Sequence, residues 1–120
     1  MSYKFSTGSV RQGDIYFEDD RTGAQTYIDF GQDTITLRPS GSAILHAQHD
    51  RVGIGTNSPI VTLDINGGLR VQSDRIAIDN SKTPPHAGAN GQAGQICWDS
   101  NYLYVCVATN TWKRVALSSW

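Results

Sequence analysis

The chain has few aliphatic and aromatic side chains for its length. Its 120 residues include ten Ile, seven Val, six Leu and three Phe, which is 26 residues in all. This fraction lies just above the level at which chains tend to stay disordered. The net charge is only −1, so charge repulsion does not account for the shortage. Such a thin core predicts either a protein that is marginally stable alone or, as the favoured interpretation, one that completes its core with copies of itself.

Clustered positive charge and long apolar runs are also missing. The ten basic residues are scattered singly apart from Lys113-Arg114, whereas binding to nucleic acid needs a basic stripe, so we predict no nucleic-acid partner. No apolar run approaches the roughly 20 residues that cross a bilayer, so we predict no membrane insertion. The first six residues lack the apolar core of a signal peptide, which predicts synthesis in a cytoplasm.

Only two cysteines occur, Cys97 and Cys106. A two-residue turn at Ser100-Asn101 would place Cys97 opposite Tyr104 and make Cys106 a diagonal neighbour. Diagonal positions lie about 7–8 Å apart between Cα atoms, beyond comfortable disulfide geometry. A three-residue loop would instead put the two thiols on opposite faces. Both registers predict free, packed thiols.

Helical periodicity is missing as well, because no window combines i, i+3, i+4, i+7 apolar spacing with caps. Short alternating segments bounded by turn residues, one about every 8–12 residues, predict an all-β fold of short antiparallel strands. The expected strands cover 14–18, 26–30, 34–38, 43–45, 52–54, 61–65, 69–71, 75–79, 95–99, 102–107 and 111–117.

Glycine alternates with apolar residues in the segment 51–56, where the strands before and after it meet. Val52 and Ile54 point to one side, while Gly53 and Gly55 let another backbone approach on the other. We expect the apolar pair to face a core and the glycines to admit a neighbouring chain. Further on, Asn66-Gly67-Gly68 is a strong hairpin signal, which predicts that 63–65 pairs with 69–71.

Composition divides the chain into four segments. Residues 1–13 are polar, with apolar side chains only at Tyr3, Phe5 and Val10. We interpret them as an extended N-terminal arm that becomes ordered on a partner surface, and a frayed terminus is the alternative. The remaining segments are a β-rich body at 14–79, an extended linker with nothing to bury at 80–94, and a three-stranded module at 95–120.

Aromatic side chains gather in the C-terminal module, which holds all three Trp and two of the five Tyr. These residues are Trp98, Tyr102, Tyr104, Trp112 and Trp120. Packing in a small core is the favoured interpretation, since buried aromatics dominate such cores. Stacking on sugars or contact with a protein partner is the alternative.

No grouping of residues predicts a metal site or a cofactor. Gly53–Thr56 lacks the phosphate-loop pattern. His46 and His49 lie three residues apart on an extended chain and face opposite sides, whereas zinc normally needs four converging ligands. A metal on the axis of an oligomer stays open as an alternative if His46 points inward.

The carboxylates likewise do not predict catalysis. Asp19-Asp20 and the pair Asp29 and Asp33 are candidates for acid–base cleavage of a glycan. All four flank predicted turns, where Asp side chains bond the nearby backbone. On this basis the sequence predicts no enzymatic activity.

Several segments resemble modules of virion proteins. Arg51–Thr56 with Ser58-Pro59, followed by Leu63–Val71, resembles a module that recurs in bacteriophage tail fibres, and the strands at 26–37 resemble the fibre unit that precedes it. The segment from Gly94-Gln95-Ile96-Cys97-Trp98-Asp99 to Trp112-Lys113-Arg114-Val115 is similar to a terminal module of marine, cyanophage-type structural proteins. Together these likenesses cover roughly residues 14–117.

This resemblance implies an intertwined homotrimer in the virion. With the two predictions made above from the residues, the expected protein is not enzymatic and is made in the host cytoplasm. The expected protein is a short fibre or fibre-like appendage attached through its N-terminal arm to capsid, tail or adaptor proteins. A trimeric capsid decoration protein and a receptor-binding tip for host glycan are the alternatives. The expected trimer interface comprises Val52, Gly53, Ile54, Gly55, Leu63, Ile65, Leu69 and Val71.

Overall fold

The computed structural model describes residues 15–16 and 26–120. The expected arm at 1–13, with Tyr3, Phe5 and Val10, lies outside these residues, as do Asp19 and Asp20. The arm therefore stays a prediction.

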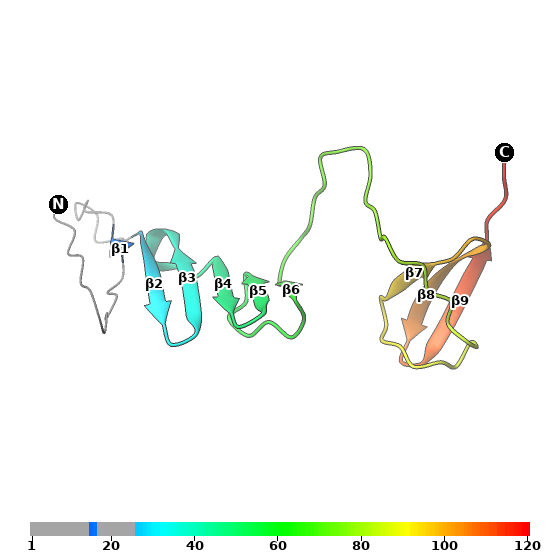
Figure 1. Ribbon diagram of the computed structural model, residues 1–120, viewed down its shortest axis with the longest axis horizontal. Helices are drawn as coiled ribbons and strands as arrows, with labels where there is room; N and C mark the ends of the chain where they lie inside the picture. Colours follow the sequence, from blue (N-terminus) through cyan, green and yellow to red (C-terminus); the bar gives the residue numbers. More distant parts are fainter. Residues whose placement is uncertain (1–14, 17–25) are drawn as a thin grey trace. The chain divides into compact units, whose positions relative to one another are not determined.

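The chain is built from short strands and forms two compact units (Figure 1). The first unit ends at Arg70, and the second covers Val71–Trp120. The helical element of the described part is η1 (Pro39–Gly41), a three-residue 3-10 turn, and no described helix could span a membrane. The predicted all-β class is confirmed.

Six strands form the sheet of the first unit, and each lies beside the strand that precedes it in the chain (Figure 1). They are β1 (Ile15–Tyr16), β2 (Tyr27–Gly31), β3 (Thr34–Arg38), β4 (Leu45–Gln48), β5 (Arg51–Ile54) and β6 (Leu63–Ile65). β1 to β5 are antiparallel, as predicted. Tight turns with positive φ at Asp33 (59°) and His49 (53°) reverse the chain, and the strand expected at 43–45 starts at Leu45.

One face of this sheet is apolar along its whole width. Cross-strand partners share a face, and the register aligns two rows of them. The rows are Ile15, Ile28, Leu37, Leu45, Ile54 and Ile65, and Phe30, Ile35, Ala47, Val52 and Leu63. This apolar face is open in a single chain, with Leu63 56% and Ile35 45% exposed. The buried residues described in the first unit are Thr36, Gly53 and Pro59, none of which supplies an aliphatic side chain to a core.

The last pairing of the sheet differs from the expected hairpin. β6 runs parallel to β5, tied to it by Val52 N–H to Thr62 O at 2.8 Å and Asn66 N–H to Ile54 O at 2.9 Å. Asn66 also donates from Nδ2 to Gly55 O at 3.3 Å. Because Asn66 is bound to the end of β5, the Asn66-Gly67-Gly68 segment does not fold β6 back on the residues that follow.

The strands predicted at 69–71 and 75–79 are therefore wrong. These residues form no strand, and Leu69 and Ile76 are 72% and 73% exposed. Alternating apolar residues indicate a strand with one buried face, but none of the described strands pairs with these two segments.

The second unit holds an antiparallel sheet of β7 (Ile96–Trp98), β8 (Tyr102–Ala108) and β9 (Thr111–Ala116). The predicted turn at Ser100-Asn101 is confirmed, because Asp99 N–H donates to Tyr102 O at 3.0 Å and Cys97 lies opposite Tyr104. Both cysteines are free and buried, as predicted.

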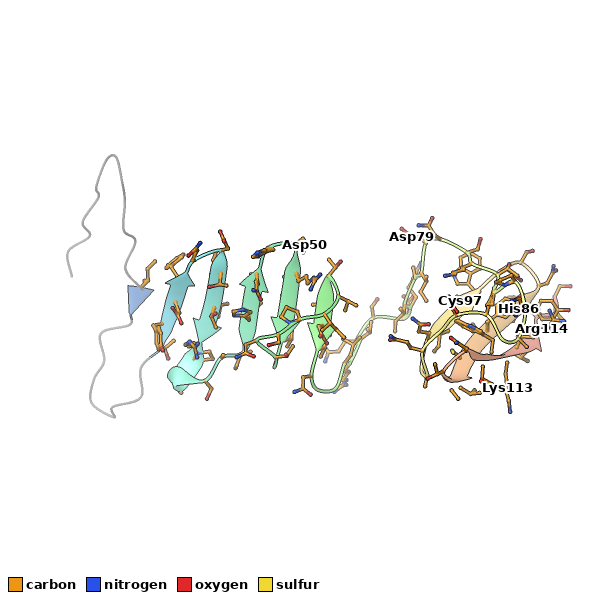
Figure 2. All side chains as sticks on the ribbon, turned by 90° about the horizontal axis from the view of Figure 1, so that it is seen from below. Asp50, Asp79, His86, Cys97, Lys113 and Arg114 are labelled. Carbon is orange, nitrogen blue, oxygen red and sulfur yellow. The ribbon has the colours of Figure 1, made fainter. Side chains whose placement is uncertain are left out.

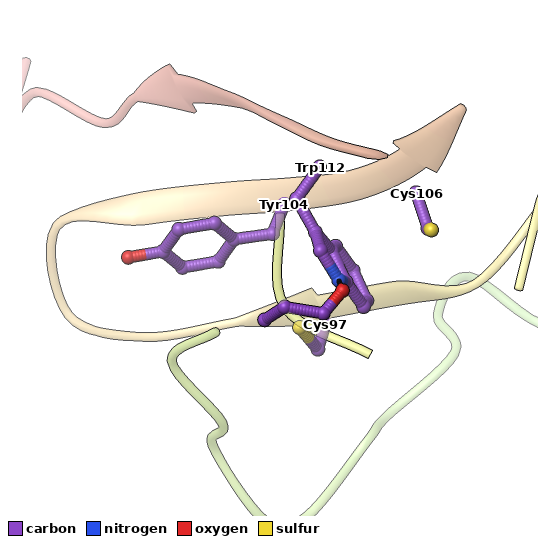
Figure 3. Packing of buried hydrophobic residues seen from close by; sticks show 5 residues of the cluster. Cys97, Tyr104, Cys106 and Trp112 are labelled. Carbon is purple, nitrogen blue, oxygen red and sulfur yellow. Dashed lines mark hydrogen bonds between the residues drawn. The ribbon is translucent and has the colours of Figure 1, made fainter. Parts of the chain in front are cut away.

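Residues 82–94, within the segment expected to be a linker, form a second layer on this sheet. Lys82 N–H donates to Trp98 O on β7, while Asn110 N–H in the β8–β9 turn and Trp112 N–H on β9 donate to Gly91 O and Ala87 O. Ala89 is buried among Cys97, Tyr104, Cys106 and Trp112, which lie on one face of the sheet (Figure 3). Composition missed this packing because the residues that the segment buries, Pro84 and Ala89, are small and form no apolar pattern in the sequence.

Candidate functional site

Asp99 is the hydrogen-bonding centre of the second unit. Its Oδ1 accepts from the N–H groups of Asn101 and Tyr102, both at 2.8 Å. Its Oδ2 accepts from Thr83 Oγ1 and from Tyr104 OH, both at 2.6 Å. The hydrogen bond from Thr83, followed by that from Tyr104, holds the pKa of Asp99 well below its usual range, while the bond to Asp99 raises the pKa of Tyr104. This one carboxylate joins the β7–β8 turn, the sheet and the second layer.

Arg114 extends the same face of the sheet toward the β9 edge. It lies opposite Tyr104 in the register, and its Cζ is 4.0 Å from the centroid of the Tyr102 ring, in cation–π range. The Tyr102 and Tyr104 rings are in turn 5.8 Å apart at an interplanar angle of 51°. Arg114 therefore lies against the tyrosine pair through its contact with Tyr102.

A cavity of about 360 Å³ opens between the segment 84–87 and β9. Its lining includes Pro84, Pro85, His86, Trp112 and Arg114. A second cavity of about 370 Å³ shares Pro84, Pro85, His86 and Trp112 with it, and adds Lys82. Figure 2 labels His86, Lys113 and Arg114 in this unit. Both volumes fall in the range of small-molecule sites.

The five aromatic residues proposed to contact a partner do not form one surface. Tyr104 and Trp112 are 4% and 8% exposed and belong to the core, where Trp112 Nε1 donates to Ala89 O at 3.1 Å. Trp98 lies on the opposite face, with Nε1 bonded to Ile78 O at 2.7 Å, and Trp120 is fully exposed at the chain end. Tyr102 is half-buried under Arg114.

Sequence reasoning did not place Pro84, Pro85, His86 or Arg114 at a site. The available signal was the adjacent basic pair Lys113-Arg114, beside a tryptophan, within a module otherwise poor in charge. The cavity depends on the packing of the second layer against β9, which the composition of that segment does not reveal.

The expected trimer-interface residues have mixed surroundings within one chain. Val52, Ile54, Leu63 and Ile65 lie on the apolar face, while Leu69 and Val71 follow the sheet and are exposed. Gly53 and Gly55 already have close neighbours in their own chain: the carbonyl of Thr56 stands where a Gly53 Cβ would be, and Asn66 O would lie 2.7 Å from a Gly55 Cβ. Gly55 also has a φ of +71°. Their place in a trimer interface stays a prediction.

The residues weighed for metal binding or acid–base chemistry in the first unit have simple partners. His46 Nδ1 lies 2.7 Å from Thr36 Oγ1, and Asp29 Oδ2 accepts from Arg38 Nε at 3.1 Å. Over residues 15–16 and 26–120, no group of three or more His, Cys, Asp or Glu side chains is placed to hold a metal ion.

The chain is similar to two curated phage proteins. It is 47% identical over 89 residues to "Depolymerase 1, capsule K30/K69-specific" of Klebsiella phage K5-2, a match that covers 72% of this chain and 10% of that protein. It is 49% identical over 37 residues to "Depolymerase, capsule K30/K69-specific" of Klebsiella phage K64-1, covering 31% of this chain and 5% of that protein. The chain therefore spans about a tenth or less of the length of these relatives. No family model and no solved structure matches it.

These matches support the phage-appendage interpretation and a location in the virion. The marine type of phage stays a prediction, because both relatives come from phages of Klebsiella. The prediction of a non-enzymatic protein is contradicted, since both relatives are named as depolymerases, which are enzymes. That prediction rested on the absence of a catalytic group of residues in a chain of 120 residues. The chain matches only a small part of much longer enzymes, so this absence is not informative about enzymatic activity.

Proposed function

We propose that the chain is part of a phage tail appendage that engages the bacterial capsule and takes part in its depolymerisation. The observation that carries this proposal is the 47% identity over 89 residues to a protein named as a capsule-specific depolymerase. An identity of this size over most of the chain favours a shared role in the appendage. It also favours the tail over the capsid decoration alternative.

The test uses the purified chain and a panel of isolated bacterial capsular polymers that includes the K30 and K69 types. Binding is measured by biolayer interferometry with immobilised polymer, and cleavage by the fall in polymer mass in light scattering. We expect saturable binding to at least one capsule type, with shortening of that polymer as the fuller result. A folded chain that neither binds nor shortens any member of the panel would overturn the proposal.

We further propose that the chain works as a homotrimer. The apolar face of the first unit is uncovered in a single chain, and single-layer sheets with one bare apolar face are not stable in water without a cover. The same apolar face on other copies of the chain is an apolar surface of the same size, and it is present at the concentration of the protein itself. Other virion proteins then contact the N-terminal arm at 1–13, through Tyr3, Phe5 and Val10, which attaches the appendage to the particle.

Sedimentation velocity tests this assembly. A chain of 13.1 kDa should sediment at three times that mass, and Leu45→Asp on the apolar face should abolish the trimer. Gln48→Asp is the matched control, because Gln48 lies in the same strand on the opposite face. A stable folded monomer of the natural chain, or a trimer that survives Leu45→Asp, contradicts the proposal.

The attachment role of the arm is tested separately. Removing residues 1–13 should leave the trimer intact and abolish its incorporation into phage particles, measured by mass spectrometry of purified virions. Incorporation at the natural level without the arm would place the attachment elsewhere.

A further inference from the structure

The cavity beside Arg114 combines an unneutralised cation with an apolar floor. Residues 80–120 contain three basic residues, Lys82, Lys113 and Arg114, and one acidic residue, Asp99. The ion pairs of the described chain are Asp29–Arg38, Asp50–Arg51 and Asp74–Arg75, so these three cations have no carboxylate partner there. All four hydrogen bonds to Asp99 come from other groups. A binding surface for an anion is thus present within a chain of net charge −1.

Arg114 is the cation best placed to select the shape of that anion. Its Cζ lies 4.0 Å from the centroid of the Tyr102 ring, and this cation–π contact restricts the guanidinium group. A planar guanidinium donates two parallel N–H bonds to a carboxylate, whereas an ammonium group acts as a point charge. Since Tyr102 has already restricted the side chain, little further rotamer entropy is lost when a ligand binds.

The rest of the cavity suits a sugar ring better than a bare inorganic ion. Pro84, Pro85 and Trp112 supply apolar walls, and His86 supplies a polar ring nitrogen. On β9, the N–H group of Trp112 points away from β8 and donates to Ala87 O. Strand alternation directs the Arg114 N–H to the same edge, beyond the point where the second layer pairs with β9. A pyranose offers C–H faces for the walls and hydroxyl oxygens for such donors.

We propose that this cavity binds a carboxylate-bearing sugar residue, a uronate unit of an acidic polysaccharide. Arg114 would bind the carboxylate, and Pro84, Pro85 and Trp112 would contact the ring. The inference rests on the proposed function in that it takes the capsular polymer as the source of the sugar. It also identifies a site different from the five-aromatic surface that the sequence suggested.

Nuclear magnetic resonance titration of the full chain tests the site with small probes. Methyl β-glucuronide should shift the Trp112 indole N–H and the Arg114 amide signals in a saturable way. Neutral methyl β-glucoside should bind at least about tenfold more weakly, because it lacks the charge-assisted bonds. Equal binding of the two sugars, or equally tight binding of inorganic phosphate, would overturn the proposal.

Variants then assign the effect to Arg114. Arg114→Gln should weaken glucuronide binding by about tenfold or more, and Arg114→Lys should restore only part of it, since lysine keeps the charge without the fork. Arg75→Gln is the matched control, because Arg75 belongs to the same unit and is paired with Asp74 outside the cavity. Unchanged binding in Arg114→Gln, with its thermal midpoint equal to that of Arg75→Gln, refutes the site.

The two proposals fail in different ways. A chain that binds capsular polymer but not the glucuronide keeps the proposed function and loses this site. Carboxyl reduction of the polymer, which converts uronates to neutral sugars, also distinguishes the two proposals. If the reduced polymer binds as tightly as the untreated one, the uronate site is refuted and the proposed function is kept.

Discussion

At the scale of single residues, Gly53 shows how a pattern can be right about crowding and incomplete about its source. The alternation of glycine with Val52 and Ile54 predicts a close approach on the glycine side. The structure supplies that approach from Thr56 of the same chain, whose carbonyl stands where a side chain would begin. Any Cβ at position 53 therefore forces the turn after β5 to move.

Gly53→Ala should destabilise the first unit, by about 1–3 kcal/mol, because the added methyl group meets backbone that has no alternative rotamer. Gly67→Ala is the control, since a Cβ there meets nothing within 4 Å. Urea unfolding followed by circular dichroism measures both variants. Equal stability of the two would mean that the Thr56 contact relaxes freely.

Asp99 makes the second unit sensitive to acid. Its pKa in the folded state is lowered, first by the hydrogen bond from Thr83, whereas in the unfolded chain it returns to about 3.9. A lowered folded pKa contributes stability that is present above the unfolded pKa and is lost as the pH falls below it. The thermal midpoint of the second unit should therefore decline below about pH 4.

Asp99→Asn should lower the midpoint at neutral pH by several degrees and flatten this acid decline, because one oxygen cannot accept all four hydrogen bonds. Ser100→Ala, in the adjoining exposed turn, should retain the decline. Melting curves between pH 2 and 7 compare them. An acid decline of equal size in Asp99→Asn would assign the effect to other groups.

At the scale of elements, the second layer over β7, β8 and β9 depends on small residues at close contact. Ala89 is 8% exposed within the core, and a Gly91 Cβ would lie 2.7 Å from Trp112 Nε1. A larger or charged side chain at either place would push the segment off the sheet. The segment can therefore pack on the sheet only because Ala89 and Gly91 have small side chains or none.

Ala89→Asp should destabilise the second unit by about 2–4 kcal/mol, since it buries a carboxylate beside Trp112. Ala93→Asp, which is exposed in the same segment, should have little effect. Thermal melting with the Trp112 indole N–H signal as a local probe measures both. A native-like Ala89→Asp protein would show that the layer is not needed for the fold.

The elements that the sequence predicted are those set by neighbouring residues. The β7–β8 hairpin follows from its turn and alternation, and so do β2 and β3 with the turn at Asp33. The parallel pairing of β6 with β5 was not predictable in this way, because Asn66 bonds to Ile54 across an intervening loop. Likewise, the sequence indicated the aromatic residues of the site, while the cavity at Arg114 required knowing that residues 84–87 pack beside β9.

At the scale of the whole molecule, the two units differ in how far each completes its own packing. All five buried hydrophobic residues among those described, from Ala89 to Trp112, belong to the second unit. On the apolar face of the first unit, every described strand has aliphatic side chains that are partly or largely exposed. Its stability therefore depends on what covers that face.

If copies of the chain provide this cover, the thermal midpoint of the first unit should rise with protein concentration, because association is coupled to folding. The midpoint of the second unit should respond less. Scanning calorimetry from about 5 to 500 μM, a hundredfold range, detects this, since mass action over that range is worth several RT. A first-unit midpoint that is independent of concentration would argue against the trimer.

The two thiols of the second unit have a consequence for its resistance to oxidation. Burial raises the pKa of Cys97, and Cys106 is fully buried with Sγ 3.1 Å from Ala108 O. Oxidants react with exposed thiolates, so a buried and protonated thiol is oxidised slowly. We therefore expect the second unit to resist cross-linking between copies through Cys97 or Cys106 in aerated buffer, although the described residues contain no disulfide.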